Sequence, residues 1–312
     1  MNDLFALKLF TRVARLSSFS KAARELRVSQ PHASRLVAGL ESDLGTALLS
    51  RTTRTVVLTD VGAEYLIRIQ AILDALEDAN QDARGTTELA GELRIGLPIS
   101  IAIREIIPRL PHFTMQHPGL RLSLLMEDQR QDLLRDGVDV ALRFGELDDS
   151  TATARLIATN QRLLVASPAY LGRRGTPRVP SDLQHHSIIV APPSMKAADW
   201  LFTKGTRRVA VKVEPSLTVS ANEAATTAAV AGLGIVLTGL FACRAELASG
   251  TLVRLLADWH QPDSPVHAVF PYGRATKRAA RTFIDYIAEE FRTGTNLMQQ
   301  GATAAWTHKP WT

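Results

Sequence analysis

The sequence predicts an α/β protein with a helix-rich, winged helix-turn-helix domain at its N-terminus and a larger α/β region behind it. Three observations support this fold class. A helix-turn-helix pattern occupies residues 19–44, a helical stretch without proline runs over 60–84, and strand-like and helix-like segments then alternate as far as residue 291. A chain of 312 residues accommodates two or three domains of this kind.

The helix-turn-helix pattern rests on the spacing of apolar residues. Small apolar residues recur at helical spacing up to Leu26, the pattern breaks for two residues, and a second helix begins at about Gln30. Ser29 is a favourable N-cap, and Pro31 is tolerated in the first turn because its missing N–H would have no partner there. A helical stripe at residues 4–14 is expected to close the core beneath this helix pair.

The second helix of the pair has one apolar side and one narrow polar side. Its apolar side carries Ala33, Leu36, Val37, Leu40 and Leu44. Its polar side carries Gln30, Pro31, Ser34, Arg35 and Ala38. Gln, Ser and Arg side chains bind base edges and phosphates, and small neighbours let a helix approach closely, so this side favours DNA recognition. A helical hairpin with a structural role in a core has similar spacing and is the alternative.

A two-stranded wing is predicted after Gly45. Arg51 and Arg54 flank two threonines, and a β-branched run follows at 55–57, which is typical of a short hairpin. Guanidinium groups on such a hairpin would lie against the DNA backbone or in the minor groove. An exposed hairpin whose arginines only confer solubility is the alternative.

With both helices and the wing, residues 1–84 resemble the DNA-binding part of LysR-type transcriptional regulators. The motifs that carry the resemblance are Ser29-Gln30-Pro31, Ser34-Arg35, Leu40-Glu41 and Leu58-Thr59. His32 and Leu36 depart from the family pattern; Leu36 lies on the apolar side, and nothing in the sequence supports a DNA contact from His32. The residues assigned to DNA binding, from the resemblance and the wing, are Ser29, Gln30, Pro31, Ser34, Arg35, Arg51 and Arg54.

Charge and composition limit the classes of protein to which this chain can belong. Residues 1–59 hold nine of the 36 basic and four of the 31 acidic residues, so this segment carries the whole net charge of +5, as expected if one domain meets a polyanion. The sequence shows no signal-peptide pattern and no apolar run of membrane-spanning length, which predicts a cytoplasmic protein without membrane contact. The single cysteine, Cys243, excludes an internal disulfide, and we interpret it as a buried apolar residue rather than a redox sensor.

One long helix is predicted over residues 60–84, capped by Thr59 and followed by a hinge that ends near residue 87. Apolar residues at alternating three- and four-residue steps form a seam, and this pattern predicts packing against a partner helix. Those assigned to a subunit contact are Leu66, Ile69, Leu73 and Leu76. The helix would span roughly 37 Å, too long for a small domain to cover. We expect a dimer helix that spaces two DNA-reading helices; a connector packed on its own chain is the alternative.

The α/β region contains nine predicted strands and three further helices. The strands lie at 92–97, 120–126, 139–144, 163–166, 188–190, 209–213, 217–219, 235–237 and 266–270, and the helices near 101–116, 129–135 and 277–291. DGVDVALRFGELDDS and LLVASPAYLGRRGTPRVPSDLQHH carry the LysR resemblance here. It implies two α/β lobes around a cleft, similar to type 2 periplasmic binding proteins.

The predicted domains are residues 1–59, a linker at 60–87, and an effector-binding domain at 88–293. Lobe I is expected at about 91–161 and 267–293, and lobe II at about 162–266. Residues 294–312 are expected to form a mobile tail, although Trp306 and Trp311 could instead dock on a partner.

Two helix starts at strand ends are candidate ligand sites, because ligands of two-lobed α/β folds bind at the carboxyl ends of strands. Ser100 would cap a helix beginning at Ile101, and Ser220 with Glu223 forms a capping-box pattern. Each cap alone has a structural explanation. The resemblance places both around the cleft, and the residues assigned to effector binding are Ser100, Arg143, Asn222 and Thr238. The hypothesis is an anionic effector.

No cofactor and no metal site are expected. His185 and His186 lack a third ligand at suitable spacing, and the resemblance assigns a structural His here. The segment 232–234 is too short for a dinucleotide fingerprint.

The predicted function is that of a non-enzymatic transcriptional regulator that binds double-stranded promoter DNA and senses a small molecule. It is expected to form a homodimer, and by resemblance a tetramer or larger assembly, and contact with RNA polymerase is a further expectation. The alternatives are a cytoplasmic solute-binding or an enzymatic α/β domain with an appended DNA-binding module. An enzyme would need acid, base or nucleophile residues that converge in the cleft.

Overall fold

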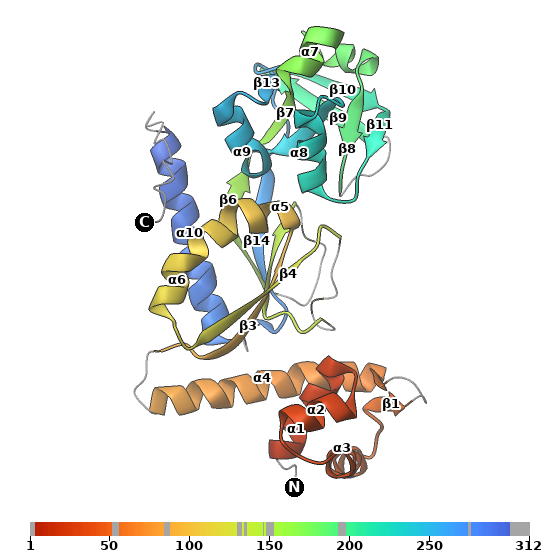
Figure 1. Cartoon of the computed structure of the whole chain (residues 1–312), viewed down its shortest axis with the longest axis vertical. Helices are drawn as coiled ribbons and strands as arrows, with labels where there is room; N and C mark the ends of the chain where they lie inside the picture. The colour runs from red at the N-terminus through yellow and green to blue at the C-terminus, as the bar shows by residue number, and fades with distance from the viewer. Residues whose placement is uncertain are drawn as a thin grey trace.

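The computed structural model describes residues 4–51, 56–83, 88–129, 133, 136–145, 147, 153–192, 198–273 and 276–299. A small N-terminal domain lies at one end of the molecule, helix α4 (Asp60–Ala83) runs across it, and two α/β lobes follow in line (Figure 1). Among the residues described, no helix is long and apolar enough to cross a membrane.

The N-terminal domain consists of α1 (Leu4–Leu16), α2 (Phe19–Glu25), α3 (Gln30–Leu44), β1 (Leu49–Arg51) and β2 (Val56–Leu58). The structure confirms that α3 begins at Gln30, because the Ser29 hydroxyl accepts a hydrogen bond from the N–H of His32 at 3.4 Å. The helix ends at Gly45, whose φ of +66° favours glycine. β1 and β2 pair antiparallel, as expected of a wing. Arg54 lies outside the described residues.

Helix α4 is capped by Thr59, whose hydroxyl accepts the N–H of Gly62 at 2.9 Å. Its apolar seam faces its own chain: Leu66, Ile69 and Leu73 are buried in the core of the N-terminal domain. These three residues therefore pack against their own chain, as the alternative of an intramolecular connector predicted. Their assignment to a subunit contact is corrected. The physical reason is that these three side chains complete the apolar core formed by α1, α2 and α3.

The exposed side of α4 carries a different set of apolar residues. Val61, Ile72 and Leu76 are 51%, 56% and 37% exposed. Of the residues assigned to a subunit contact, only Leu76 therefore lies on the accessible side.

Lobe I is built on a five-stranded sheet in the order β4-β3-β5-β14-β6. Its strands are β3 (Gly91–Leu97), β4 (Leu120–Met126), β5 (Val140–Phe144), β6 (Thr153–Asn160) and β14 (Ser264–Phe270). β3 pairs parallel with β4 and β5, and β14 pairs antiparallel with β5 and β6. The helical segments are α5 (Ile99–Ile101), η1 (Ala102–Ile106), η2 (Ile107–Arg109), α6 (Leu110–Gln116) and α10 (Arg278–Gln299).

Two expectations for lobe I are corrected. The strand β6 was not predicted, and α10 continues to Gln299 instead of ending at Phe291. Residues 294–299 are therefore helical rather than part of a tail, whereas Trp306 and Trp311 lie outside the described residues. Most of the helix predicted at 129–135 also lies outside them.

Lobe II has a second five-stranded sheet in the order β11-β8-β12-β7-β13 and a separate hairpin. The strands are β7 (Arg162–Ala166), β8 (Ile188–Val190), β11 (Pro215–Thr218), β12 (Ile235–Gly239) and β13 (Val253–Leu255), with β9 (Ala198–Lys204) and β10 (Arg207–Val213) in the hairpin. The helices are α7 (Pro168–Arg174), η3 (Pro180–His185), α8 (Asn222–Val230) and α9 (Leu240–Ser249). Cys243 is fully buried, and burial raises the pKa of its thiol to about 12.

Helix α4 meets lobe I through a partly buried cluster of charged residues. The Lys277 ammonium, just before α10, lies 2.9 Å from the carboxylate of Asp139 and 4.0 Å from that of Asp74 in α4. Gln70 donates a hydrogen bond to Asp74 at 2.7 Å, and Asp139 accepts the N–H of Arg94 at 2.9 Å. Burial raises the pKa of Asp74 to about 6, against the opposing influence of Lys277.

The raised pKa of Asp74 predicts a pH dependence of stability. The folded state holds the proton more tightly than the unfolded chain, whose pKa is 3.8, so Asp74 removes stability as the pH rises from about 4 to about 6. The variant Asp74→Asn lacks this loss. Its free energy of unfolding in urea, relative to the parent, should therefore increase across that window by up to about 3 kcal/mol and stay constant above it.

The control for this measurement is Glu77→Gln, an exposed carboxylate on the same helix. If the free energy of unfolding of Asp74→Asn differs from that of the parent by the same amount at every pH, the pKa of Asp74 is not raised in the folded state.

Candidate nucleic-acid interface and effector cleft

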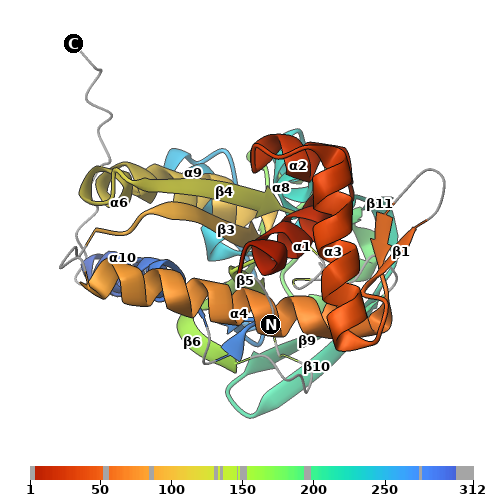
Figure 2. The same cartoon turned by 90° about the horizontal axis from the view of Figure 1, so that it is seen from below.

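The solvent-facing side of α3 presents the residues predicted to read DNA. Gln30, Pro31 and Arg35 are exposed and Ser34 is half-buried, while the opposite side of the helix is buried. The separation of the two sides predicted from the sequence is confirmed. Viewed from the end of the molecule that the N-terminal domain occupies, α3 lies in front of the two lobes (Figure 2). Its polar side can therefore approach a large partner.

A carboxylate of α3 holds the base of the wing. Oε1 of Glu41 accepts hydrogen bonds from the N–H groups of Leu48 and Leu49, both at 2.9 Å. The Thr59 hydroxyl ties the other strand to the carbonyl of Ala47 at 2.8 Å. Glu41 therefore fixes the base of the wing relative to the recognition side of α3. Sequence reasoning noted Leu40-Glu41 only as a family motif and gave Glu41 no role.

The four residues assigned to the effector site lie on both lobes. Ser100 in α5 is 5% exposed and Thr238 in β12 is 6% exposed. Asn222 is the first residue of α8, and Arg143 is half-buried near the end of β5. The structure brings α5 and the start of α8 together, whereas Arg143 and Thr238 lie on the sheets of the two lobes.

Both predicted helix caps are wrong. Helix α5 begins at Ile99, so Ser100 lies within the helix instead of capping it. Helix α8 is preceded by Ala221, which gives no side-chain cap, and Glu223 is engaged elsewhere. The reason is that a distant residue already satisfies the first N–H of each helix.

That residue is Asp128, which follows β4 in lobe I. Its Oδ1 accepts the N–H of Ile99 at 2.8 Å, and its Oδ2 accepts the N–H of Asn222 at 2.6 Å. One carboxylate thus joins helices of the two lobes. Sequence reasoning missed Asp128, although an acidic residue just beyond a strand end was an available signal.

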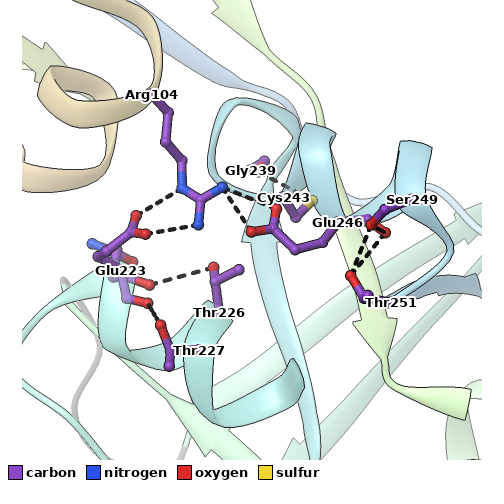
Figure 3. A network of polar contacts seen from close by, with 10 residues as sticks. Arg104, Glu223, Thr226, Thr227, Gly239, Cys243, Glu246, Ser249 and Thr251 are labelled. Carbon is purple, nitrogen blue, oxygen red and sulfur yellow. Dashed lines mark hydrogen bonds and ion pairs between the residues drawn. The ribbon is translucent and has the colours of Figure 1, made fainter. Parts of the chain in front are cut away.

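A second connection between the lobes is the ion-pair network of Arg104 (Figure 3). Its Nε and Nη2 donate to the two oxygens of Glu223 at 2.8 and 2.7 Å, and its Nη1 donates to Glu246 at 2.9 Å. Arg104 belongs to lobe I, whereas both glutamates lie on lobe II. The hydrogen bonds to Glu223 raise the pKa of Arg104, so the guanidinium stays charged and paired with both carboxylates.

The adjacent Glu105 extends this network. It is almost fully buried and lies 3.0 Å from the guanidinium of Arg109 and 3.6 Å from that of Arg244. Burial raises the pKa of Glu105, and the two arginines oppose that effect. Charges of both signs therefore line the contact between the lobes.

Two cavities lie outside the predicted effector site. One of about 410 Å³ is lined by residues of α8 and α9, including Thr227, and by Thr251 just after α9, and one of about 140 Å³ lies between α4 and lobe I. In the part of the chain that the structure describes, no three His, Cys, Asp or Glu residues are grouped as metal ligands. His186 instead contacts the hydroxyl of Tyr170 at 3.2 Å.

The comparison with family models decides the identity of this arrangement. Residues 4–63 match the model of the bacterial regulatory helix-turn-helix protein, lysR family, and residues 86–292 match the LysR substrate binding domain. The chain belongs to the LysR family of transcriptional regulators. LysR-type regulators bind DNA and small-molecule effectors, are oligomeric, and are not enzymes. The predicted fold class and general function are confirmed.

Individual LysR-type relatives are similar over almost the whole chain. An uncharacterised HTH-type transcriptional regulator of Haemophilus influenzae is 34% identical over 275 residues, which cover 88% of this chain and 96% of that relative. The solved structure of CrgA from Neisseria meningitidis is 32% identical, with a TM-score of 0.59 over 93% of this chain and 99% of CrgA. Full-length AphB, a virulence activator of Vibrio cholerae, is 26% identical, with a TM-score of 0.58 over 92% of this chain and 99% of AphB.

Proposed function

We propose that this LysR-type regulator reads its operator with the exposed side of α3 and holds its effector between the two lobes. The exposure of Gln30 and Arg35 on the side of α3 that faces away from the buried Ala33, Val37 and Leu40 carries the first part. Glutamine and arginine form paired hydrogen bonds with adenine and guanine, respectively. Ser29, Pro31 and Ser34 lie in the same two turns, and Arg51 and Arg54 of the wing add contacts to phosphate or the minor groove.

Removal of the reading side chains tests the first part. Arg35→Ala and Gln30→Ala should each weaken operator binding by about 1–3 kcal/mol and leave the fold unchanged, because each removes a base contact. Arg54→Ala should weaken binding to every sequence and reduce its salt dependence. Fluorescence anisotropy, with a duplex recovered from genomic fragments that the protein retains and with a scrambled duplex, measures both effects.

Lys212→Ala is the matched control, since it removes one exposed positive charge from lobe II, far from α3. Operator affinities of Arg35→Ala and Gln30→Ala equal to that of Lys212→Ala would exclude the proposed interface.

We further propose that the subunit contact uses the exposed side of α4. Ile72 and Leu76 present apolar surface there, while Leu66, Ile69 and Leu73 are already covered by the N-terminal domain. Two antiparallel or parallel copies of a helix of this length can cover each other and set the distance between two α3 helices. A tetramer through the α/β lobes remains an expectation from the resemblance.

Charged substitutions distinguish the two sides of α4. Ile72→Glu and Leu76→Glu should raise the dimer dissociation constant at least about tenfold, because a charge would be buried without a partner. Leu73→Glu should instead unfold the N-terminal domain. Sedimentation velocity and circular dichroism report the two outcomes. Leu201→Glu is the control, because Leu201 is an exposed residue on β9 of lobe II. Unchanged sedimentation of Ile72→Glu and Leu76→Glu would exclude the proposed subunit contact.

The effector site is proposed between Ser100 and Asn222, with Thr238 and Arg143 nearby on the two sheets. Ser100 and Thr238 are polar side chains that are almost fully buried close to strand ends. Binding of a molecule at this place would contact both lobes at once, which gives it a means to favour one arrangement of the lobes over another.

A thermal-shift screen of small molecules on the full-length protein tests this site. Ligands that stabilise the parent should bind at least about tenfold more weakly to Ser100→Ala and Asn222→Ala, since each lost hydrogen bond leaves a polar group unpaired. Thr227→Ala, on the exposed side of α8, is the control. Ligands affected only by Thr227→Ala would place the effector in the cavity between α8 and α9 instead.

A further inference from the structure

The contact of Asp128 with two backbone amides suggests more than a structural link. The carboxylate accepts one hydrogen bond from lobe I, at Ile99, and one from lobe II, at Asn222. We propose that Asp128 is a built-in ligand of the effector cleft, which holds the lobes in their resting arrangement and which the anionic group of an effector must displace. This inference rests on the effector site proposed above.

The geometry defines what could replace Asp128. Two N–H groups from different lobes point at the two oxygens of one carboxylate, at 2.8 and 2.6 Å. A carboxylate or a similar oxyanion of an effector can accept the same two bonds. Asp128 is only half-buried, so solvent and small molecules can reach it. Ser100 lies in the turn that begins at Ile99, which places a buried hydroxyl beside the same position.

Arg104, which also joins the lobes, cannot serve as the anion-binding group. Arg104 donates to both oxygens of Glu223 and to Glu246. Because its charge is already paired with two carboxylates, an incoming anion would meet repulsion there. The backbone amides held by Asp128 are donors that the cleft can offer to an anion once Asp128 leaves them.

A tethered carboxylate also explains how the cleft can reject common anions. A group on the same chain competes as if it were present at a millimolar or higher concentration. Free inorganic anions at ordinary concentrations do not displace it. An effector succeeds only if its anionic group is joined to a body that gains further contacts in the cleft, for example with Ser100 or Thr238. Specificity then follows from competition with the protein's own side chain.

Displacement of Asp128 would act directly on the first turn of α8. Asn222 is held by Asp128, and the next residue, Glu223, is held by Arg104. Both contacts come from lobe I. Exchange of one contact for an effector changes the position of α8 relative to lobe I while the ion pair keeps the lobes joined. The same turn thus contains a replaceable contact and a retained one.

Chemical rescue by acetate tests the proposal without knowledge of the effector. The full-length variant Asp128→Ala leaves both amides without a carboxylate and should unfold at a lower temperature than the parent. Sodium acetate should raise its unfolding temperature saturably, by about 2–4 °C more than sodium chloride of equal ionic strength does. Acetate supplies the same carboxylate as the missing side chain.

The controls separate this effect from general salt effects. Glu127→Ala removes a neighbouring exposed carboxylate and should show no acetate response beyond that of the parent. Asp128→Asn keeps the size of the side chain and should also respond weakly, because its amide oxygen still occupies the site. Equal acetate responses of Asp128→Ala, Glu127→Ala and the parent would overturn the proposal.

Ligands from the thermal-shift screen provide the second measurement. Those that carry a carboxylate should bind Asp128→Ala and Asp128→Asn at least tenfold more tightly than the parent and should abolish the acetate response. Equal affinity for parent and both variants would overturn displacement. If acetate rescues Asp128→Ala but the ligands are insensitive to Ser100→Ala and Asn222→Ala, the proposed effector site fails, while the role of Asp128 as the resting contact stands.

Discussion

The packing of α4 on the N-terminal domain is the contact on which the rest of the arrangement depends. Leu66, Ile69 and Leu73 are buried in one core with Phe10 of α1, and the added Cβ of any other residue at Gly62 would collide with the backbone. A domain of this size buries little apolar surface by itself, so α4 cannot leave it without exposing that core. α3, the wing and α4 therefore move as one body.

The lobes are joined in another way, through both apolar and polar contacts. Phe241 of α9 is buried in the core of lobe I, where its ring stacks on Phe291 with centroids 5.3 Å apart. Around it lie the bridge through Asp128 and the ion pairs of Arg104 with Glu223. Hydrogen bonds and bidentate ion pairs require defined angles, whereas apolar contact does not. The polar contacts between the lobes therefore depend more strongly on the relative orientation of the lobes than the contact of Phe241 does.

Local signals explain which elements can be predicted from the sequence. Ser29, Pro31 and Gly45 bracket α3, so both of its ends follow from residue chemistry. Contacts between distant segments leave no such signal. The apolar period of α4 shows that one side is buried, but not that its own domain buries it. Likewise, the pattern at Ser220 suggests a side-chain cap, yet Asp128, 94 residues earlier in the chain, accepts the first N–H of α8.

In lobe I, β3 runs from the contact with α4 to the position of Asp128. β3 begins at Gly91, beside the cluster of Lys277 and Asp74, and ends just before Ile99, where Asp128 is bound. A close-packed sheet transmits displacement rather than absorbing it. At the α4 end, the contact with lobe I is ionic, while the contact of α4 with its own domain is apolar. Because ion pairs depend on distance and angle more strongly than apolar packing does, we expect the ionic contact to break first if the lobes change arrangement, so that α4 and α3 would reorient together.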